Sequence, residues 1–285
     1  MSTWRVATFN IRHGLGDDGR VDLVRTAREI AALDADVIGL QEVDQGFGPR
    51  SGYEDQAARL GELLGMQVCF GAALELPPAG EGESSRRYGL ALLTRREILF
   101  HAVHLLPAHP GHERPAETRG VLQAKVRGPG EQELEVLVTH LDNVSRAHRT
   151  AQVQGIVRLA DVLEGPAMLM GDMNADPAAP ELAALAATGW REAVREGASP
   201  QGTVAARSAV PAQRRSRHSP ARAQLHALVT TLRSLRLATH PARLPVRRID
   251  SLWVRGEIEV CRVEVGARRS SDHRPVVATV HNPQC

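Results

Sequence analysis

The sequence contains few cysteines, and those present are widely separated. The three are Cys69, Cys261 and Cys285, and no two of them form a C-x-x-C pair. A disulfide-stapled domain and a cysteine-based zinc site both need numerous or closely spaced cysteines. We therefore exclude both and expect the cysteines to be reduced and structural.

Long apolar runs are also missing from the 285-residue chain. No uncharged apolar stretch approaches the roughly 18 residues that a membrane-spanning helix needs. The first 14 residues lack the basic start, the apolar run and the small-residue cleavage site of a secretory signal. We expect a cytoplasmic protein with no transmembrane segment, built as a single domain over residues 1–285, with a monomer favoured.

Acidic residues are absent between residues 197 and 249, although ten arginines lie there. The rest of the chain holds 25 basic against 33 acidic residues, so the body is acidic and one segment is basic. We interpret about 197–245, rich in Ala, Arg and Ser, as an insertion with one helical piece at 225–237. Its arginines fit either contacts to nucleic-acid phosphates or a solvated loop. Aromatic residues are only 3% of the chain, so stacking surfaces for single strands are scarce.

Alternating strand and helix patterns occupy the remainder of the chain. Apolar periodicity predicts strands at 4–10, 36–41, 88–94, 120–126, 134–140, 167–171, 249–254, 258–265 and 274–280. It predicts helices at 23–31, 55–64, 146–163 and 180–188, with Asp22 as the N-cap of the first. Many strands with few long helices indicate two packed sheets flanked by helices, with active residues on loops at one end.

Carboxylates, amides and histidines stand where several of these strands end. Hydrolysis of a phosphate ester needs a cation for the non-bridging oxygens, a carboxylate or base for the attacking water, and donors that follow the developing charge. Hard oxygen ligands suit Mg²⁺ or Mn²⁺. The sequence offers such groups in six segments: Thr8–Asn10, Leu40–Asp44, Thr139–Asp142, Gly171–Asn174, Arg248–Asp250 and Ser271–Val276.

Each of these residues also has a purely structural interpretation. Asn10 fits a turn after its strand, and Glu42 fits a solvated strand end. Asp172 and Asn174 fit an Asx turn. Asp44 is kept outside the site.

The remaining residues differ in how easily a structural role explains them. Asp250 fits a simple pair with Arg247 or Arg248, and His140 alone fits a satisfied polar residue of the core. Asp272 and His273 are harder to explain in this way, because a carboxylate beside an imidazole suits metal binding and proton transfer together.

Taken in order, the segments form a specific joint pattern. TFN, LQEVD, THLD, GDMNADP, RRIDSLWV and SSDHRPVVATV resemble the endonuclease/exonuclease/phosphatase family, which includes deoxyribonuclease-I-like enzymes, abasic-site endonucleases, sphingomyelinases and inositol-phosphate phosphatases. The resemblance runs from about residue 4 to 280, apart from the Arg-rich segment. It implies an α/β (α+β) fold, a four-layer α-β-β-α sandwich of two mainly antiparallel sheets flanked by helices.

The resemblance also implies roles for the individual residues. Glu42 is the primary metal ligand, with Asn10 beside it and Asp272 completing the surroundings of an Mg²⁺ or Mn²⁺ ion. Arg119 is assigned to substrate binding, although it fits a structural arginine equally well.

Catalysis is assigned to five further residues. Asp172 aligns or deprotonates the attacking water or assists the leaving group, and Asn174 donates to the phosphate. Asp250 orients His273, and His140 and His273 stabilise the charge of the phosphate or act as general acid and base. Because a carboxylate partner favours imidazolium, we expect the pair of Asp250 and His273 to be partly protonated near neutral pH.

A histidine-rich stretch at 101–113 raises the question of a second metal. His109, His112 and Glu113 stand near His101 and His104. The H-x-x-H-E order differs from the helical H-E-x-x-H zinc motif, and Pro107 and Pro110 oppose a helix. We do not expect a dedicated zinc site there.

The substrate is left open by these residues. The segments NIRHG and GRVDLVRTAREIAALDADVIGLQEVD resemble a bacterial subgroup of metal-dependent hydrolases, itself similar to eukaryotic domains connected with lipid-anchor remodelling. We expect a phosphodiesterase, nuclease-like and with nucleic acid as a possible partner. The alternatives are a lipid or small-molecule phosphodiesterase or phosphatase, and a catalytically retired nucleic-acid-binding protein.

Overall fold

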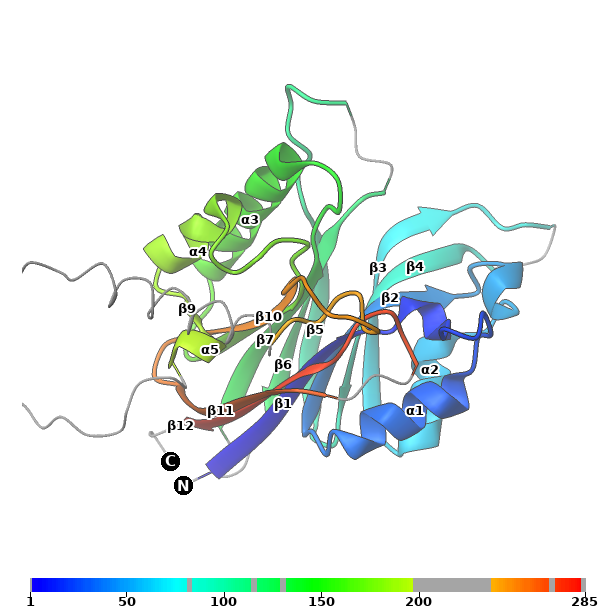
Figure 1. The fold of residues 1–285 in the computed structure, drawn as a ribbon, viewed down its shortest axis with the longest axis horizontal. Helices are drawn as coiled ribbons and strands as arrows, with labels where there is room; N and C mark the ends of the chain where they lie inside the picture. Colours follow the sequence, from blue (N-terminus) through cyan, green and yellow to red (C-terminus); the bar gives the residue numbers. More distant parts are fainter. Residues whose placement is uncertain are drawn as a thin grey trace, which may run out of the picture.

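Two six-stranded sheets make up most of the molecule (Figure 1). This computed structural model describes residues 2–80, 84–113, 117–128, 132–196, 237–266 and 270–282. In spatial order the first sheet contains β11 (Glu259–Val265), β12 (Val276–Asn282), β1 (Ser2–Asn10), β2 (Val37–Gln45), β4 (Arg86–Thr94) and β3 (Gln67–Leu76). The second contains β5 (Ile98–Leu105), β6 (Gly120–Arg127), β7 (Glu133–His140), β8 (Ala167–Asp172), β10 (Asp250–Arg255) and β9 (Arg191–Glu192).

Both sheets follow the same pairing order. Each has a central parallel pair, β1 with β2 in one sheet and β7 with β8 in the other, and the remaining named pairs are antiparallel. The predicted sandwich of two mainly antiparallel sheets is therefore confirmed.

Helices cover the outer faces of the two sheets (Figure 1). The first sheet carries α1 (Leu23–Ala32) and α2 (Gln56–Leu64), and the second carries α3 (Arg146–Ala160) and α4 (Ala183–Ala187). The short α5 (Ala193–Glu196) follows β9, and its Ala193 packs in the layer between the sheets. The Asp22 carboxylate accepts a hydrogen bond from the Arg25 N–H and caps α1, as predicted, and Asp55 caps α2 in the same way. None of the helices in the described ranges is long and apolar enough to cross a membrane.

The strand periodicity of two divides the core into three layers. On β1, Trp4 and Val6 pack between the sheets, whereas Ala7 and Phe9 pack beneath α1 and α2. On β8, Met168 and Met170 face the other sheet, whereas Leu169 packs under α3. Alternate burial on both faces produces the predicted α-β-β-α order of layers.

Several elements differ from the sequence prediction. β3 and β5 were not predicted; β5 alternates between half-buried and exposed positions, so its apolar signal is weak. The predicted helix at 180–188 is instead a 3-10 turn, Pro180–Leu182, followed by α4. β2 continues to Gln45, beyond its predicted end at Gln41.

The Arg-rich segment lies outside the described residues from 197 to 236, and so does the helical piece predicted there up to residue 236. Its last part, 237–245, is described and is tied to the rest of the fold. The Ala242 N–H donates to the Asp272 carbonyl at 2.6 Å, and the Arg274 N–H donates to the Thr239 carbonyl at 2.9 Å. These bonds place residues 237–245 beside the segment that carries Asp272 and His273.

Candidate active site

Five strands bring their polar ends to one end of the sandwich. In the first sheet, Asn10 at the end of β1 pairs with Gln41 of the parallel strand β2. In the second sheet, Asp172 at the end of β8 pairs with His140 of β7 and with Asp250 of β10. Because parallel neighbours end at the same edge, each sheet delivers polar side chains to the same region.

Glu42 stands at an irregularity inside β2, not at its end. The pairing of β2 with β4 shifts register between Gln41 and Val43, and Glu42 has a φ of 58°. A non-glycine residue in this left-handed region costs about 1 kcal/mol or more, and such strain persists where the surroundings enforce it. Burial raises the pKa of Glu42, against an opposing hydrogen bond from Asn10. The bulge therefore turns a poorly hydrated carboxylate toward the site.

Asn10 joins the carboxylates of the two sheets. Its amide nitrogen donates to Glu42 Oε1 at 2.9 Å and to Asp172 Oδ2 at 3.1 Å, and its oxygen accepts from the Arg12 N–H at 3.0 Å. The bond from a backbone N–H identifies the oxygen of this amide. In this arrangement Asn10 bridges two carboxylates as a donor, and it would have to turn its amide to offer oxygen to a cation.

Asp172 and Asn174 form the tight turn that the structural interpretation suggested. The Asn174 N–H donates to Asp172 Oδ1 at 2.9 Å, and Asn174 has a φ of 50°. Its side-chain nitrogen donates to the Leu141 carbonyl at 3.0 Å. Burial, followed by the charge of Asp250, raises the pKa of Asp172 to about 7. The turn thus holds a fully buried carboxylate with an unusually high proton affinity at the centre of the site.

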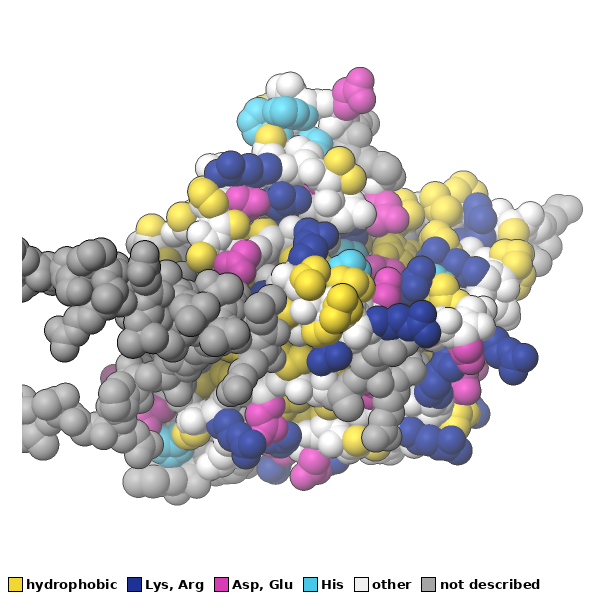
Figure 2. Space-filling model, in the orientation of Figure 1, with side chains coloured by type: hydrophobic (Ala, Val, Ile, Leu, Met, Phe, Trp, Pro, Cys, Tyr) yellow, Lys and Arg dark blue, Asp and Glu magenta, His cyan; other side chains and the backbone are white. Residues whose placement is uncertain are grey.

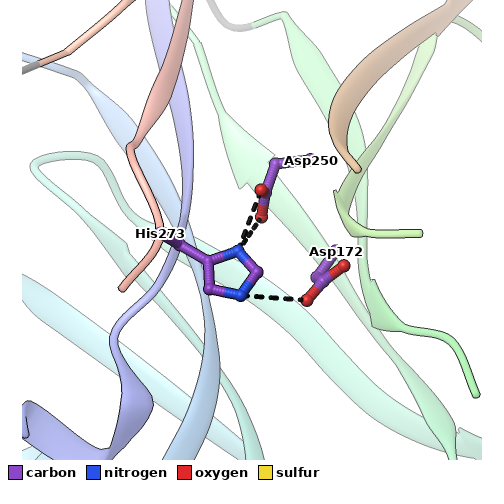
Figure 3. A group of neighbouring side chains, drawn as sticks. All are labelled: Asp172, Asp250 and His273. Atoms are coloured by element: carbon purple, nitrogen blue, oxygen red, sulfur yellow. Dashed lines mark hydrogen bonds and ion pairs between the residues drawn. The ribbon is translucent and has the colours of Figure 1, made fainter. Parts of the chain in front are cut away.

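His273 lies between Asp250 and Asp172 (Figure 3). Its Nδ1 is 2.9 Å from Asp250 Oδ2, and its Nε2 is 3.7 Å from Asp172 Oδ2. Burial, the largest single effect, lowers the pKa of His273, but the charges of Asp250 and Asp172 outweigh it and raise the pKa to about 10. The imidazole is therefore a cation at neutral pH. Among the described residues, neither Arg247 nor Arg248 forms the alternative ion pair with Asp250, and Arg248 pairs with Glu192 instead.

His140 has the opposite electrostatic environment. Its Nδ1 lies 3.1 Å from a guanidinium nitrogen of Arg119, and its Nε2 lies 3.5 Å from Asp172 Oδ2. Arginine can only donate, so Nδ1 accepts and the proton is on Nε2. Burial, then the charges of Arg119 and His273, lower the pKa of His140 far below its ordinary value. The site thus combines one neutral and one charged imidazole around Asp172.

Asp272 is the most exposed of the predicted ligands. Its carboxylate forms an ion pair with Arg12 at 3.3 Å. The Ser271 hydroxyl donates to the Asn10 carbonyl at 2.7 Å and accepts from the His273 N–H at 3.2 Å. This serine therefore ties the segment bearing Asp272 to the end of β1.

An open cleft of about 410 Å³ lies at this end of the sandwich. Among the predicted site residues, those that line it are Glu42, Arg119, His140, Asp172, Asn174, Asp272 and His273, and all of these except Glu42 and Asp272 are buried. Asn10 and Asp250 are also buried but do not line the cleft. The structure thus brings all nine predicted residues together at one site. On the face seen in Figure 2, histidine and acidic side chains are visible near the centre, with basic side chains close by.

The cleft also contains residues that the sequence did not single out: Arg50, Tyr88, Glu117, Asn143, His240, Arg247 and Ile249. The His240 ring packs on His273 with 4.7 Å between centroids. Arg247 was one of ten arginines in the basic segment, and composition alone could not separate it from the rest. Arg50 is the partner that the fully buried carboxylate of Asp44 requires, but the burial of Asp44 is visible only in the structure.

Two sets of residues could hold a cation. The first set is the one group in the described part of the chain in which three His, Cys, Asp or Glu side chains bring ligand atoms within 4.8 Å of one another. It consists of Asp172, Asp250 and His273. The hydrogen bond to Asp250 already engages Nδ1 of the His273 imidazole. Glu42 and Asp272 instead offer oxygen atoms on the cleft wall, and burial of Glu42 leaves its charge in need of compensation. Oxygen donors of this kind fit Mg²⁺ or Mn²⁺.

The histidine-rich stretch does not assemble such a group among the described residues. His104 Nε2 contacts Gln123 Oε1 at 2.8 Å, and the His109 N–H donates to His148 Nδ1 at 2.9 Å. The ring of His109 lies 4.9 Å from that of His112, edge to face. His104 therefore joins β5 to β6, whereas His109 and His112 pack the loop after β5 on His148 of α3.

One family model matches nearly the whole chain. It is the model of the Endonuclease/Exonuclease/phosphatase family, and it covers residues 7–273. A search of curated protein sequences finds no match.

Solved structures share the fold at low sequence identity. An endonuclease/exonuclease/phosphatase from Beutenbergia cavernae is 22% identical, with a TM-score of 0.72 over 99% of this chain and 72% of the other. A mannosyl-6-phosphatase from Bacteroides thetaiotaomicron is 16% identical, with a TM-score of 0.66 over 98% and 99% of the two chains. D. rerio TDP2 in complex with a single-strand DNA product is 16% identical, with a TM-score of 0.62 over 99% and 100%.

Proposed function

Because the chain belongs to the endonuclease/exonuclease/phosphatase family, whose members hydrolyse phosphate esters, we propose that it is a divalent-cation-dependent phosphodiesterase. One observation carries the proposal. A charged His273, a neutral His140 and the buried Asp172 meet in one cleft with the oxygen ligands Glu42 and Asp272. This set contains a base, hydrogen-bond donors and oxygen ligands for a cation. Hydrolysis of a phosphate ester requires all three.

Asp172 is the proposed acceptor of the proton from the attacking water. Its pKa near 7 suits a general base at neutral pH, and Asn10 and the Asn174 N–H hold its two oxygens in place. Water attacks the phosphorus in line with the bond to the leaving alcohol, and that P–O bond breaks as the new one forms.

His140 and His273 face the charge that develops on the phosphate. The Nε2–H of His140 donates as a neutral imidazole, whereas His273 contributes a full positive charge. His273 can also give its Nε2 proton to the departing alkoxide, while Asp250 holds Nδ1 and keeps the ring oriented. Asn174, whose N–H fixes Asp172, is proposed as a further donor to the phosphate.

Glu42 and Asp272 are the proposed ligands of an Mg²⁺ or Mn²⁺ ion, with Asn10 next to them. Such an ion supplies charge neutralisation to the non-bridging oxygens. Arg119 is proposed to contribute to substrate binding through its position in the cleft and through His140, which it holds.

A substrate panel tests the preference for diesters. With Mg²⁺ or Mn²⁺ present, bis(p-nitrophenyl) phosphate and plasmid DNA should be compared with p-nitrophenyl phosphate. We expect the diester to be cleaved with the larger kcat/KM and the activity to be lost in His273→Ala. Cleavage of the monoester alone would overturn the diester preference; the Bacteroides mannosyl-6-phosphatase shows that the fold also accommodates a phosphatase.

Nucleic acid is the second candidate substrate, favoured by the ten arginines between residues 197 and 249 and by the DNA-bound structure of D. rerio TDP2. Deletion of residues 197–236 tests it. If the arginines contact DNA, the deletion should abolish plasmid cleavage and its steep salt dependence but spare the small diester. Equal loss of both activities would instead indicate damage to the fold.

A catalytically retired, nucleic-acid-binding protein is the alternative from another class. Calorimetric titration with Mn²⁺ separates the two, because a retired site should show no binding that depends on Glu42. Saturable binding in the wild type that disappears in Glu42→Gln supports the enzyme. Monomeric state and cytoplasmic location stay predictions of the sequence.

A further inference from the structure

Arg50 enters the cleft from the turn that follows β2, and a buried carboxylate fixes it there. Its Nε and one terminal nitrogen donate to Asp44 at 2.9 and 2.7 Å, a two-point contact. Asp44 also accepts from the Ser51 hydroxyl at 2.7 Å, and its side chain is fully buried. A planar guanidinium held at two points has little freedom left, so its remaining N–H groups point in a fixed direction.

Two aromatic rings support the same guanidinium. Its central carbon lies 4.4 Å from the centre of the Phe47 ring and 5.4 Å from that of Tyr88. The two rings are themselves in contact, with 5.6 Å between centroids. Arg50 is therefore held by a carboxylate at one edge and by aromatic rings on its face.

The second terminal nitrogen of Arg50, Nη1, donates a hydrogen bond to no residue in the described part of the chain. Of the Arg50 side chain, 41% is exposed. Arg50 and Tyr88 line the same cleft as Glu42. Because Asp44 binds the guanidinium, Arg50 forms no ion pair with Glu42, whose carboxylate accepts a hydrogen bond from Asn10.

We propose that Arg50 forms an anion subsite beside the reaction centre and selects phosphate esters that carry a second phosphate group. This inference rests on the proposed phosphoesterase function and adds the substrate class. The scissile phosphate would lie at Asp172, His140 and His273, and the second phosphate would accept N–H groups from Arg50. A hydrogen bond between charged groups supports a preference of about tenfold or more.

Matched substrate pairs test this subsite. The dinucleotide TpT should be compared with 5′-phosphorylated TpT, and glycerophosphoinositol with its 4-phosphate, so that nucleic-acid and lipid sources of the second phosphate are distinguished. We expect the wild type to show a kcat/KM about tenfold higher for the doubly phosphorylated member of at least one pair. Arg50→Gln should bring that ratio close to one.

Arg59→Gln is the matched control, because Arg59 is an arginine on the surface of α2 that pairs with Glu54 and Glu62 and does not line the cleft. It should keep the wild-type ratio. Should Arg50→Gln not fold, as judged by circular dichroism, Arg50→Lys keeps the charge without the two-point contact and should reduce the ratio severalfold. A wild-type ratio near one for both pairs, or a ratio unchanged by the Arg50 variants, would overturn the proposal.

A binding experiment separates this inference from the proposed activity. Calorimetry in EDTA should give a Kd for adenosine 3′,5′-bisphosphate about tenfold lower than that for adenosine 5′-monophosphate, and Arg50→Gln should remove the difference. If the wild type cleaves none of the diesters but shows this difference, the phosphodiesterase function fails and the anion subsite stands. If the diesters are cleaved without any preference, the subsite alone is refuted.

Discussion

At the scale of single residues, the site concentrates carboxylates that lose their hydration on folding. Glu42 and Asp172 both have raised pKa values, mainly through burial, and one amide, that of Asn10, donates to both. Such groups destabilise the free protein once they are ionised. A cation bound at the proposed site would offset this effect, so the free energy of unfolding is expected to depend on cation concentration.

Glu42→Gln should remove the dependence of stability on the cation. In EDTA at pH 7 we expect the variant to be at least as stable as the wild type, because the poorly hydrated charge is gone. With Mg²⁺ or Mn²⁺ at about 100 times its Kd, the wild type should gain about 2.7 kcal/mol and the variant nothing. Calorimetric melting measures both. Glu62→Gln on the exposed face of α2 should respond like the wild type; an equal gain in Glu42→Gln would remove Glu42 from the ligands.

His273 should make stability depend on pH in the alkaline range. Its folded-state pKa of about 10 exceeds the ordinary 6.5, so its stabilising contribution is complete below about pH 6.5 and is lost as pH rises toward 10. The free energies of unfolding of the wild type and His273→Gln should be compared without metal. The advantage of the wild type should be at least about 1 kcal/mol larger at pH 6 than at pH 10. Urea titrations at both pH values measure this, with His101→Gln as an exposed control. A difference independent of pH would contradict the charged state.

Asp250→Asn should lower kcat with little change in fold. The amide cannot hold the imidazolium as the carboxylate does, so His273 loses its charge and its orientation. We expect a loss of about 100-fold or more in kcat on bis(p-nitrophenyl) phosphate. Asp161→Asn, at the exposed end of α3, should keep full activity. Retention of activity in Asp250→Asn would show that His273 works without its carboxylate.

At the scale of elements, the two sheets approach closely where β2 crosses β7 and β8. A Cβ atom on Gly39 would lie 2.8 Å from Met170 Sδ and 2.9 Å from Val138 Cγ2. Both neighbours are buried, so they cannot move aside without disturbing the layer between the sheets. β2 carries Glu42 three residues later, so this contact also sets the position of Glu42, the proposed cation ligand.

Gly39→Ala should therefore destabilise the protein by about 1–3 kcal/mol and weaken cation binding. Chemical denaturation and Mn²⁺ titration measure the two effects. Gly48→Ala is the control, because its backbone is extended and nothing lies within 4 Å of an added Cβ. Equal stability of the two variants would mean that the sheets can separate at little cost.

The sequence predicted best those strands and helices that bury one face or both faces in the core. The strands β1, β7 and β8 and the capped helices α1 and α2 were predicted within a few residues of their observed ends. β3 and β5 escaped prediction because their half-exposed positions weaken the alternation of apolar residues. The bulge at Glu42 was also missed, since its φ of 58° reflects tertiary packing and not the preference of glutamate.

At the scale of the whole molecule, the sequence predicted which polar residues assemble in the candidate site but not the other residues that line its cleft. The nine predicted residues meet because eight of them stand at or near strand termini on one edge of the sandwich, at the ends of β1, β7 and β8 and at the starts of β6, β10 and β12. Glu42 reaches the same place from the bulge inside β2. Arg50, His240 and Arg247 come from loops whose course is set by distant contacts, and no local pattern marked them. The electrostatic contrast between His140 and His273 likewise depends on Arg119 and Asp250, which lie 21 and 23 residues away from them in sequence.

The pairing of β12 with β1 has a consequence for synthesis of the chain on the ribosome. β1 is translated before the other described strands, yet residues 2–8 find their antiparallel partners only in residues 276–282. During most of translation one side of β1 therefore offers free N–H and C=O groups, a surface that invites wrong pairing with other nascent chains. His273 emerges just before β12, so the candidate active site is completed only as that exposed edge is closed.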